Sequence, residues 1–247
     1  MKKLFFYLLF HGSCIASAQM PLLHAHNDYE KPEPLFNALR NKVFTIEADV
    51  YPGDSLFVAH DKKDINSCKT LVSMYLQPMI KMFAVNNGYI SNDTAYAPAL
   101  MIDIKENSAI VIPQLIKLIA PYRNVFDRTI NKHALMIVLS GERGNITEWN
   151  NYPPYIFFDG RPYESYDSAA LQRVAFISDS YMNYIKPKDS IEIRIKQLVL
   201  NTHNKGKLLR LWATPDNEMY WRKLYDMGID IINTDKATEC RAYFNGY

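Results

Sequence analysis

Short apolar segments recur along the chain with helix-length intervals between them, and this spacing constrains the fold more than any other feature. Each segment is bounded by turn residues, which is the pattern of parallel β-strands connected by crossover helices. The segments predict strands at Leu22–His26, Val43–Val50, Leu56–Ala59, Ala99–Ile104, Ala134–Leu139, Tyr155–Phe158, Val174–Ser178, Leu208–Ala213 and Ile229–Asn233.

The second and third of these strands meet across Pro52-Gly53-Asp54, a turn that is too short to contain a crossover helix. The third strand is therefore expected to return as the antiparallel arm of a hairpin, which leaves eight parallel strands. Helices are predicted at Pro34–Arg40, Cys68–Phe83, Ala109–Ala120, Ile191–Lys205 and Glu218–Met227.

One of these helices has an ambiguous pattern, because the letters IEIRI alternate as they would in a strand. Asp189 followed by Glu192 nevertheless resembles a capping box. Ile191, Ile195 and Leu198 also share one helical face. The segment is therefore predicted to be helical.

Eight parallel strands covered by helices predict a single-domain α/β fold, the closed (β/α)8 TIM barrel, over residues 19–247. The length of 247 residues and the 48% hydrophobic content suit one domain of this size. An open doubly wound sheet is the structural alternative. It is less favoured because no glycine-rich phosphate turn follows the first strand.

The first residues, MKKLFFYLLFHGSCIASAQ, predict a secretory signal peptide over residues 1–18. Two lysines precede a short apolar run, and small residues lead up to Ala18. The protein is therefore expected to be exported, either to a periplasm or to the medium. A lipid anchor on Cys14 is the less favoured route, because His11 stands where a lipoprotein signal usually has an aliphatic residue.

The charge balance excludes a nucleic-acid-binding role. The chain has 28 Lys and Arg and 26 Asp and Glu residues, so loss of Lys2 and Lys3 with the signal peptide brings the two numbers level. A nucleic-acid binder needs a basic excess. Cys68 and Cys240 would then be the only cysteines left. They could pair in an oxidising compartment or stay free.

Acidic side chains lie near the ends of two predicted strands, where TIM barrels place catalytic groups. In Glu47-Ala48-Asp49 and in Asp103-Ile104-Lys105, a spacing of two puts both polar residues on one face of the strand. Three converging carboxylates repel one another unless a cation neutralises them. One hard divalent ion, Mg²⁺ or Ca²⁺, is the expected partner. The alternative is a buried salt-bridge network with Lys105 or arginines.

The histidines divide by position. His26 and His60 end strands beside the carboxylates, so together they can act as a general acid and a general base. His24 points the same way but deeper, which suits an orienting or structural role. His133 precedes a strand and His203 ends a helix, and neither is assigned a function.

These residues in this order resemble the glycerophosphodiester phosphodiesterases and, more broadly, the phosphatidylinositol-phospholipase-C-like phosphodiesterase superfamily. The resemblance rests on His26, Glu47-x-Asp49, His60-Asp61, the acid two before Lys105, and the segments LWATPDN and GIDIINTD. It extends from about Leu22 to Asp235. The letters HAHNDY resemble a less characterised branch of the superfamily.

The resemblance implies a TIM-barrel enzyme that cleaves phosphodiesters with one divalent cation. The implied catalytic pair is His26 and His60, and the implied metal ligands are Glu47, Asp49 and Asp103. The implied substrate contacts are Asn27, Lys105 and Trp212. A small-molecule or lipid-derived phosphodiester is the implied substrate, and peripheral contact with a membrane is compatible with it.

Two departures from the glycerophosphodiester phosphodiesterase pattern bear on the substrate. The first histidine of that family is followed by Arg-Gly, whereas here Asn27, Asp28 and Tyr29 follow His26, so a phosphate-binding cation is missing. Asn27 and Asp28 can themselves bind a cation or a phosphate. The family's third acid is a glutamate, shortened here to Asp103.

Two other functions remain open from the residues. The His-x-His pair also looks like metal-dependent amidohydrolases and PHP-type phosphoesterases, but these need more histidines than the later strands supply. The second is an exported barrel that binds ligands without turnover. For this module the aromatic stretch NYPPYIFFDGRPYESY offers stacking surfaces, although a strand followed by an ordinary rim loop is the preferred explanation, because tyrosine is commonly half-buried.

Overall fold

The structure is a computed structural model, which describes residues 20–187 and 190–246. The predicted signal peptide, Cys14 and the capping residue Asp189 lie outside these residues. Within them, none of the helices has both the length and the apolar character needed to span a membrane. Cys68 is exposed and Cys240 is buried, and both are free thiols.

A closed barrel of eight parallel strands forms the centre of the molecule, as predicted. The sheet runs in the order β1-β9-β8-β7-β6-β5-β4-β2, and β1 also pairs with β2, which closes it. β3 pairs antiparallel with β2, so the predicted hairpin return is confirmed. The strands are β1 Leu22–Ala25, β2 Thr45–Tyr51, β3 Phe57–Val58, β4 Ala99–Ile104, β5 Met136–Gly141, β6 Ile156–Gly160, β7 Val174–Ser180, β8 Leu209–Trp212 and β9 Ile231–Thr234.

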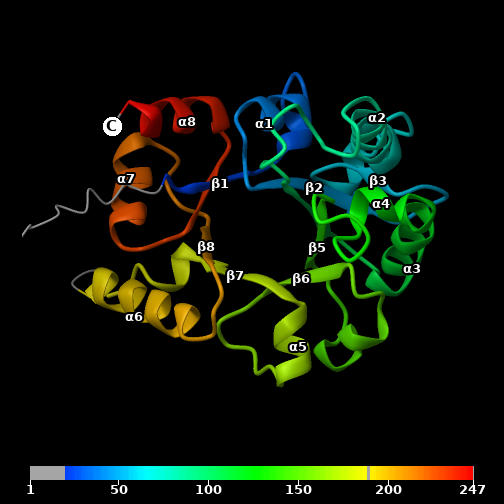
Figure 1. The fold of residues 1–247 in the computed structure, drawn as a ribbon. Helices are drawn as coiled ribbons and strands as arrows, with labels where there is room; N and C mark the ends of the chain where they lie inside the picture. Colours follow the sequence, from blue (N-terminus) through cyan, green and yellow to red (C-terminus); the bar gives the residue numbers. More distant parts are fainter. Residues whose placement is uncertain (1–19, 188–189, 247) are drawn as a thin grey trace, which may run out of the picture.

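Helices surround the strands on the outside of the barrel, as Figure 1 shows. They are α1 Phe36–Arg40, α2 Gln77–Val85, α3 Ser108–Ile119, α4 Arg123–Phe126, α5 Ser168–Arg173, α6 Ile191–His203, α7 Glu218–Asp226 and α8 Ala237–Asn245. A π-helical turn, Val72–Leu76, leads into α2. Short 3₁₀ turns cover Asp28–Glu30, Lys62–Asp64, Ala120–Tyr122, Ile146–Asn151 and Tyr181–Asn183. The five predicted helices are present, whereas α4, α5 and α8 are not predicted.

Alternation along the strands separates two apolar layers. On β4, Leu100 and Ile102 face outward and join the large core between the strands and the helices. Ala99 and Met101 face inward and pack in a smaller cluster inside the barrel. Asp103, the next inward residue, lies nearer the carboxyl end of the strand. The barrel is thus filled by apolar side chains at its base, while its polar side chains gather at the opposite end.

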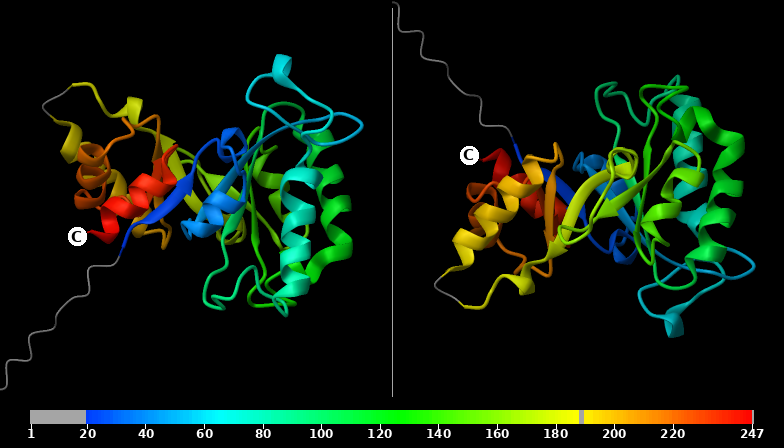
Figure 2. Two further views of the ribbon diagram at one scale, coloured as in Figure 1. Left: turned by 90° about the horizontal axis from the view of Figure 1, so that it is seen from above. Right: turned by 90° about the horizontal axis from the view of Figure 1, so that it is seen from below.

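The two side views in Figure 2 show the strands inclined within the ring of helices. The N-terminal end of β1 and the C-terminal end of α8 lie close to each other at one side of the molecule. This arrangement follows from the closed topology, because β1 pairs with β9, the strand that precedes α8.

Candidate active site

A pocket of about 300 Å³ contains all eight residues that the sequence analysis assigns to the site. It lies at the carboxyl ends of the strands, where a TIM barrel carries its chemistry. Four further residues, Ser140, Gly141, Arg161 and Arg210, complete its lining. The predicted residues are His26, Asn27, Glu47, Asp49, His60, Asp103, Lys105 and Trp212.

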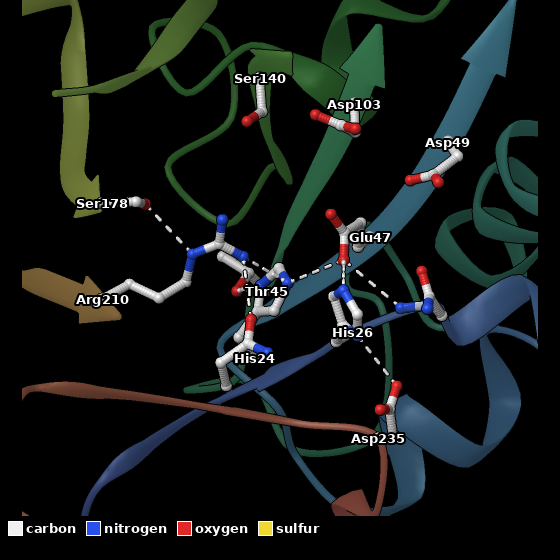
Figure 3. Close-up of polar contacts among 12 residues, drawn as sticks. His24, His26, Thr45, Glu47, Asp49, Asp103, Ser140, Ser178, Arg210 and Asp235 are labelled. Carbon is white, nitrogen blue, oxygen red and sulfur yellow. Dashed lines mark hydrogen bonds and ion pairs between the residues drawn. The ribbon is translucent and has the colours of Figure 1, made fainter. Parts of the chain in front are cut away.

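The three predicted metal-ligating carboxylates converge in this pocket, as Figure 3 shows. Asp49 and Asp103 are direct cross-strand neighbours in the pairing of β2 with β4. Glu47 lies two residues before Asp49 and therefore on the same face of β2. One oxygen from each carboxylate lies within 4.8 Å of the others. The spacing of two along each strand thus brings the three acids together.

The charges of this cluster are only partly balanced by protein groups. Lys105 Nζ lies 2.6 Å from Asp49 Oδ2 and 2.6 Å from Asp103 Oδ2, so one lysine serves both aspartates. Asp49 Oδ1 is buried and has no hydrogen-bond partner. Burial, together with the charge of Glu47, raises the pKa of Asp49 to about 6. A salt-bridge network with Lys105 is therefore present but incomplete, and the oxygen-only donor set fits a hard divalent cation.

His26 lies beside Glu47, with Nε2 at 3.8 Å from Glu47 Oε2. Its other ring nitrogen, Nδ1, contacts Asp235 Oδ1 at 2.9 Å. Burial opposes protonation of the ring, but the hydrogen bond to Asp235 and the charge of Glu47 raise the pKa of His26 above its ordinary value. His26 is thus held in place by a carboxylate that favours its charged form.

His60 lies on the other side of the carboxylates, next to Asp49 and Tyr29. Its Nδ1 is 3.1 Å from the Tyr29 hydroxyl, which in turn lies 2.8 Å from Asp49 Oδ2. A hydroxyl has one proton, and the carboxylate is its nearest acceptor. The Tyr29 oxygen therefore accepts from His60 Nδ1–H, which leaves Nε2 as the ring nitrogen that can accept a proton. Tyr29 is a site residue that the sequence analysis does not identify.

His24 is fully buried and orients its neighbours, as predicted. Arg210 Nη1 donates to His24 Nε2 at 2.6 Å, so His24 carries its proton on Nδ1 and donates it to Thr45 Oγ1, also at 2.6 Å. Burial and the charge of Arg210 lower the pKa of His24 to about 4. The ring is therefore neutral at physiological pH. It separates Arg210 from Glu47, whose Oε2 lies 3.2 Å from Nε2.

A second ionic cluster, centred on Asp159 of β6, occupies the opposite wall of the barrel. Asp159 is fully buried, and its Oδ2 lies 2.8 Å from Arg161 Nη1 and 3.5 Å from Arg210 Nη2. Hydroxyls of Ser140 and Ser178 donate to the same carboxylate. Burial disfavours ionisation, but the two arginines hold the pKa of Asp159 below its usual range.

Replacing Asp159 by asparagine should lower the free energy of unfolding by about 3–5 kcal/mol at pH 7, because two guanidinium groups then lose their buried counter-charge. Urea unfolding followed by circular dichroism measures the difference. A carboxylate with a lowered folded pKa stabilises the protein above its unfolded pKa of about 3.9, and this contribution is lost as the pH falls through the folded pKa. The gap between wild type and Asp159→Asn should therefore narrow in strong acid. A gap independent of pH would contradict the charge assignment.

Asp28, which could bind a cation or a phosphate by its chemistry, does not line the pocket. It is 1% exposed, and its Oδ2 accepts hydrogen bonds from the Leu35 backbone at 2.6 Å and from the Tyr75 hydroxyl at 2.9 Å. The turn before it places Asn27 in the left-handed region with φ 48°. This turn separates Asn27, which faces the pocket, from Asp28, which fixes the loop before α1.

Comparison with known proteins agrees with this geometry. The family model of the AIM6-like phosphodiesterase domain matches residues 15–159, which is more than half of the chain. The chain belongs to this family. It is therefore a phosphodiesterase, of the phosphoric diester hydrolase class, and the resemblance to such enzymes is confirmed. Membership in the AIM6-like family also weighs against the amidohydrolase alternative.

Curated proteins are similar in sequence to this protein over most of its length. The altered inheritance of mitochondria protein 6 homolog of Arthroderma benhamiae is 23% identical over 262 residues, which cover 90% of this chain and 83% of the relative. Altered inheritance of mitochondria protein 6 of Eremothecium gossypii is 22% identical over 268 residues, covering 86% of this chain and 67% of the relative.

Solved structures share the fold of this AIM6-like domain. A glycerophosphodiester phosphodiesterase from Parabacteroides distasonis superposes with a TM-score of 0.57 at 13% identity, covering 92% of this chain and 97% of that one. A phosphodiesterase from Oleispira antarctica, in complex with the product sn-glycerol-3-phosphate, superposes with a TM-score of 0.55 at 14% identity and the same coverage. At these identities the likeness concerns the fold alone.

Proposed function

We propose that this AIM6-like domain is exported and hydrolyses small or lipid-derived phosphodiesters with one divalent cation, Mg²⁺ or Ca²⁺, and an acid–base pair of histidines. One observation carries the proposal. Three converging carboxylates, with a buried oxygen that has no partner, lie between His26 and His60 in a single pocket. This combination provides both a cation site and two proton-transfer groups on either side of it.

Glu47, Asp49 and Asp103 would hold the cation, which when bound supplies positive charge to the oxygens of the phosphate. Lys105 brings a second positive charge to the same end of the pocket, because its Nζ already lies against Asp49 and Asp103. A phosphodiester carries one negative charge, so these groups suit its binding and the larger charge that develops on its oxygens during the reaction.

The surroundings of the two histidines suggest different roles. His26 has a raised pKa and a carboxylate partner, so it is the better candidate for the acid that protonates the leaving oxygen. His60 donates through Nδ1 to Tyr29 and keeps Nε2 as an acceptor. It is therefore the better candidate for the base that takes a proton from the nucleophile, which is water or a neighbouring hydroxyl of the substrate.

Two features bear on the substrate. The product held by the Oleispira antarctica enzyme, sn-glycerol-3-phosphate, supports a small phosphodiester. A second, more apolar cavity of about 650 Å³ lies between the segments that follow β7 and β8, and Met182, Ile185 and Ala213 contribute to its lining. Ala213 directly follows Trp212 of the pocket. The neighbouring cavity supports a diester with an apolar group, such as one derived from a lipid.

Turnover of a substrate panel tests the proposal. The panel comprises bis(p-nitrophenyl) phosphate, glycerophosphocholine, glycerophosphoinositol and phosphatidylinositol, with the monoester p-nitrophenyl phosphate as the control. At least one diester should be hydrolysed much faster than the monoester, because the site is proposed to carry a single diester charge. Binding without turnover across the panel would instead favour a barrel that has lost catalysis.

Export rests on residues 1–18, which combine two lysines, an apolar run and a small-residue end at Ala18. Mass spectrometry of the protein from its native host would identify the mature N-terminus. Cleavage after Ala18 should leave Gln19 as the first residue. A lipid-modified Cys14 would show the lipoprotein route, and a retained Met1 would contradict export through this segment.

A further inference from the structure

The missing arginine after His26 leaves Lys105 as the cation on the β4 side of the pocket. Two other cations, Arg161 and Arg210, line the pocket from the opposite wall. Arg161 directly follows β6, and Arg210 lies in the middle of β8. Neither arginine lies next to His26 in the sequence, whereas in the glycerophosphodiester phosphodiesterases the arginine directly follows the first histidine.

Arg161 is held so that one edge of its guanidinium stays available. Its Nη1 bonds to Asp159 Oδ2 at 2.8 Å and to the backbone oxygens of Asp159 and Gly160 at 3.2 and 3.0 Å. Its Nη2 makes a single long contact, 3.4 Å, with Ser140 Oγ. The side chain is 14% exposed, and it lines the pocket.

The Nη2 edge lies next to the proposed metal site. Ser140, which Nη2 contacts, is the cross-strand partner of Asp103 in the pairing of β4 with β5. Figure 3 shows the Ser140 side chain beside that of Asp103. Arg161 therefore reaches to within one side chain of a carboxylate that would bind the cation.

Arg210 adds positive charge behind Arg161. It is 4% exposed, and Ser178, His24 and Asn233 hold its nitrogens. Asp159 is the carboxylate that both guanidinium groups share, so these three residues together carry a net charge of +1. Figure 3 shows Arg210 on the other side of His24 from Glu47.

We propose that Arg161, backed by Arg210, binds a non-bridging oxygen of the substrate phosphate and so supplies the cation that is absent after His26. The inference rests on the proposed function for the identity of the substrate. A planar guanidinium fixed along one edge is well suited to bind phosphate oxygens with its other edge. In this arrangement the phosphate lies between the acidic cluster and Arg161, and the segment that directly follows β6 takes part in substrate binding.

Direct binding of inorganic phosphate to the full, Mg²⁺-loaded protein tests the proposal by isothermal titration calorimetry. Arg161→Gln should weaken phosphate binding by about 10- to 100-fold, because a charge-assisted hydrogen bond is lost. Arg161→Lys, which keeps the charge but loses the planar fork, should weaken it less. Arg40, the last residue of α1, forms an exposed ion pair with Glu33. Arg40→Gln removes the same charge there and should leave the phosphate affinity unchanged.

Kinetics distinguish the scissile phosphate from a head group. If Arg161 binds the scissile phosphate, Arg161→Gln should raise KM for every hydrolysed diester by a similar factor. A rise confined to diesters whose head group carries its own negative charge would overturn the proposal, since Arg161 would then contact the head group. Thermal melts would reveal whether Arg161→Gln has a folding defect. If it has one, Arg161→Lys is used for both measurements instead.

The outcome separates this inference from the proposed function. Phosphate binding that depends on Arg161, in a protein that hydrolyses no diester of the panel, would support the anion site and contradict the function. Diester turnover with a KM and a phosphate affinity that do not change in Arg161→Gln would support the function and overturn the anion site. Absence of phosphate binding to the wild type would also overturn it.

Discussion

EDTA is expected to reduce the hydrolysis of bis(p-nitrophenyl) phosphate to background, and Mg²⁺ or Ca²⁺ added back in excess should restore it. The reason is electrostatic. Without an ion, three carboxylates lie within 4.8 Å of one another, the two aspartates share Lys105, and the cluster repels the anionic substrate. Initial rates across a titration of each metal measure the apparent affinity. Turnover that persists in EDTA would contradict a functional cation site.

A variant of one proposed ligand provides a second measurement that does not depend on turnover. Saturating Mg²⁺ at about 100 times its dissociation constant should stabilise the wild type by about 2.7 kcal/mol. For a domain of this size this is a rise in Tm of roughly 5–10 °C. In Asp49→Asn the rise in Tm should be mostly lost, because the affinity for Mg²⁺ should fall by more than about 100-fold. Changing a residue that only supports a metal ligand costs less affinity than this. Asp226→Asn, which alters an exposed ion pair with Arg222, should keep it.

The barrel was predictable because its strands are buried on both faces. Continuous apolar runs such as Ala99–Ile104 therefore mark strands without alternation, and the observed β4 has the same bounds. The missed helices carry weaker signals. α5 has six residues and one buried side chain, Ala170. α8 buries Ala237, Cys240 and Phe244 with helical spacing, but two of these are small and the pattern is easily overlooked.

The acidic half of the site was predictable for a local reason, whereas its basic half was not. Glu47 and Asp49 have a spacing of two on one strand, so their common orientation follows from strand geometry. Arg161 directly follows β6, two residues after Asp159, whereas Arg210 lies on β8 and reaches Asp159 only in the folded barrel. No spacing along the chain reveals the contact of Arg210 with Asp159. The signal that could have revealed it is an arginine inside the apolar run LLRLW, where an unpaired charge would be very unfavourable.

Tyr29 was missed for a related reason. The letters HAHNDY suggest a polar loop, but the left-handed turn at Asn27 directs the chain so that the Tyr29 hydroxyl lies between Asp49 and His60. A single residue with positive φ changes which side chains face the pocket. The local sequence therefore identifies His26 as a residue at the end of a strand. The hydrogen bond between Tyr29 and His60, which are far apart in the sequence, forms only in the folded barrel.

Replacing either histidine of the pair by alanine should lower kcat on a hydrolysed diester by about 10²–10⁴-fold, which is the usual contribution of a positioned acid or base. His26 and His60 contact Glu47 and Asp49 from two sides of the acidic cluster, so each has a separate proton to transfer. His203→Ala, which alters a ring paired with Asp230 outside the pocket, should leave kcat unchanged. Near wild-type turnover by either His26→Ala or His60→Ala would remove that histidine from the mechanism.

Tyr29→Phe distinguishes proton transfer by His60 from a purely structural role. The phenylalanine ring keeps the packing but removes the oxygen that accepts from His60 Nδ1–H. If His60 is the base, kcat should fall by about 5- to 10-fold, the usual value of one hydrogen bond, while KM stays close to the wild-type value. In a His60→Ala background the same change should have little further effect, because the two residues would act through one proton transfer. Independent, multiplicative losses would show that Tyr29 acts through Asp49 instead.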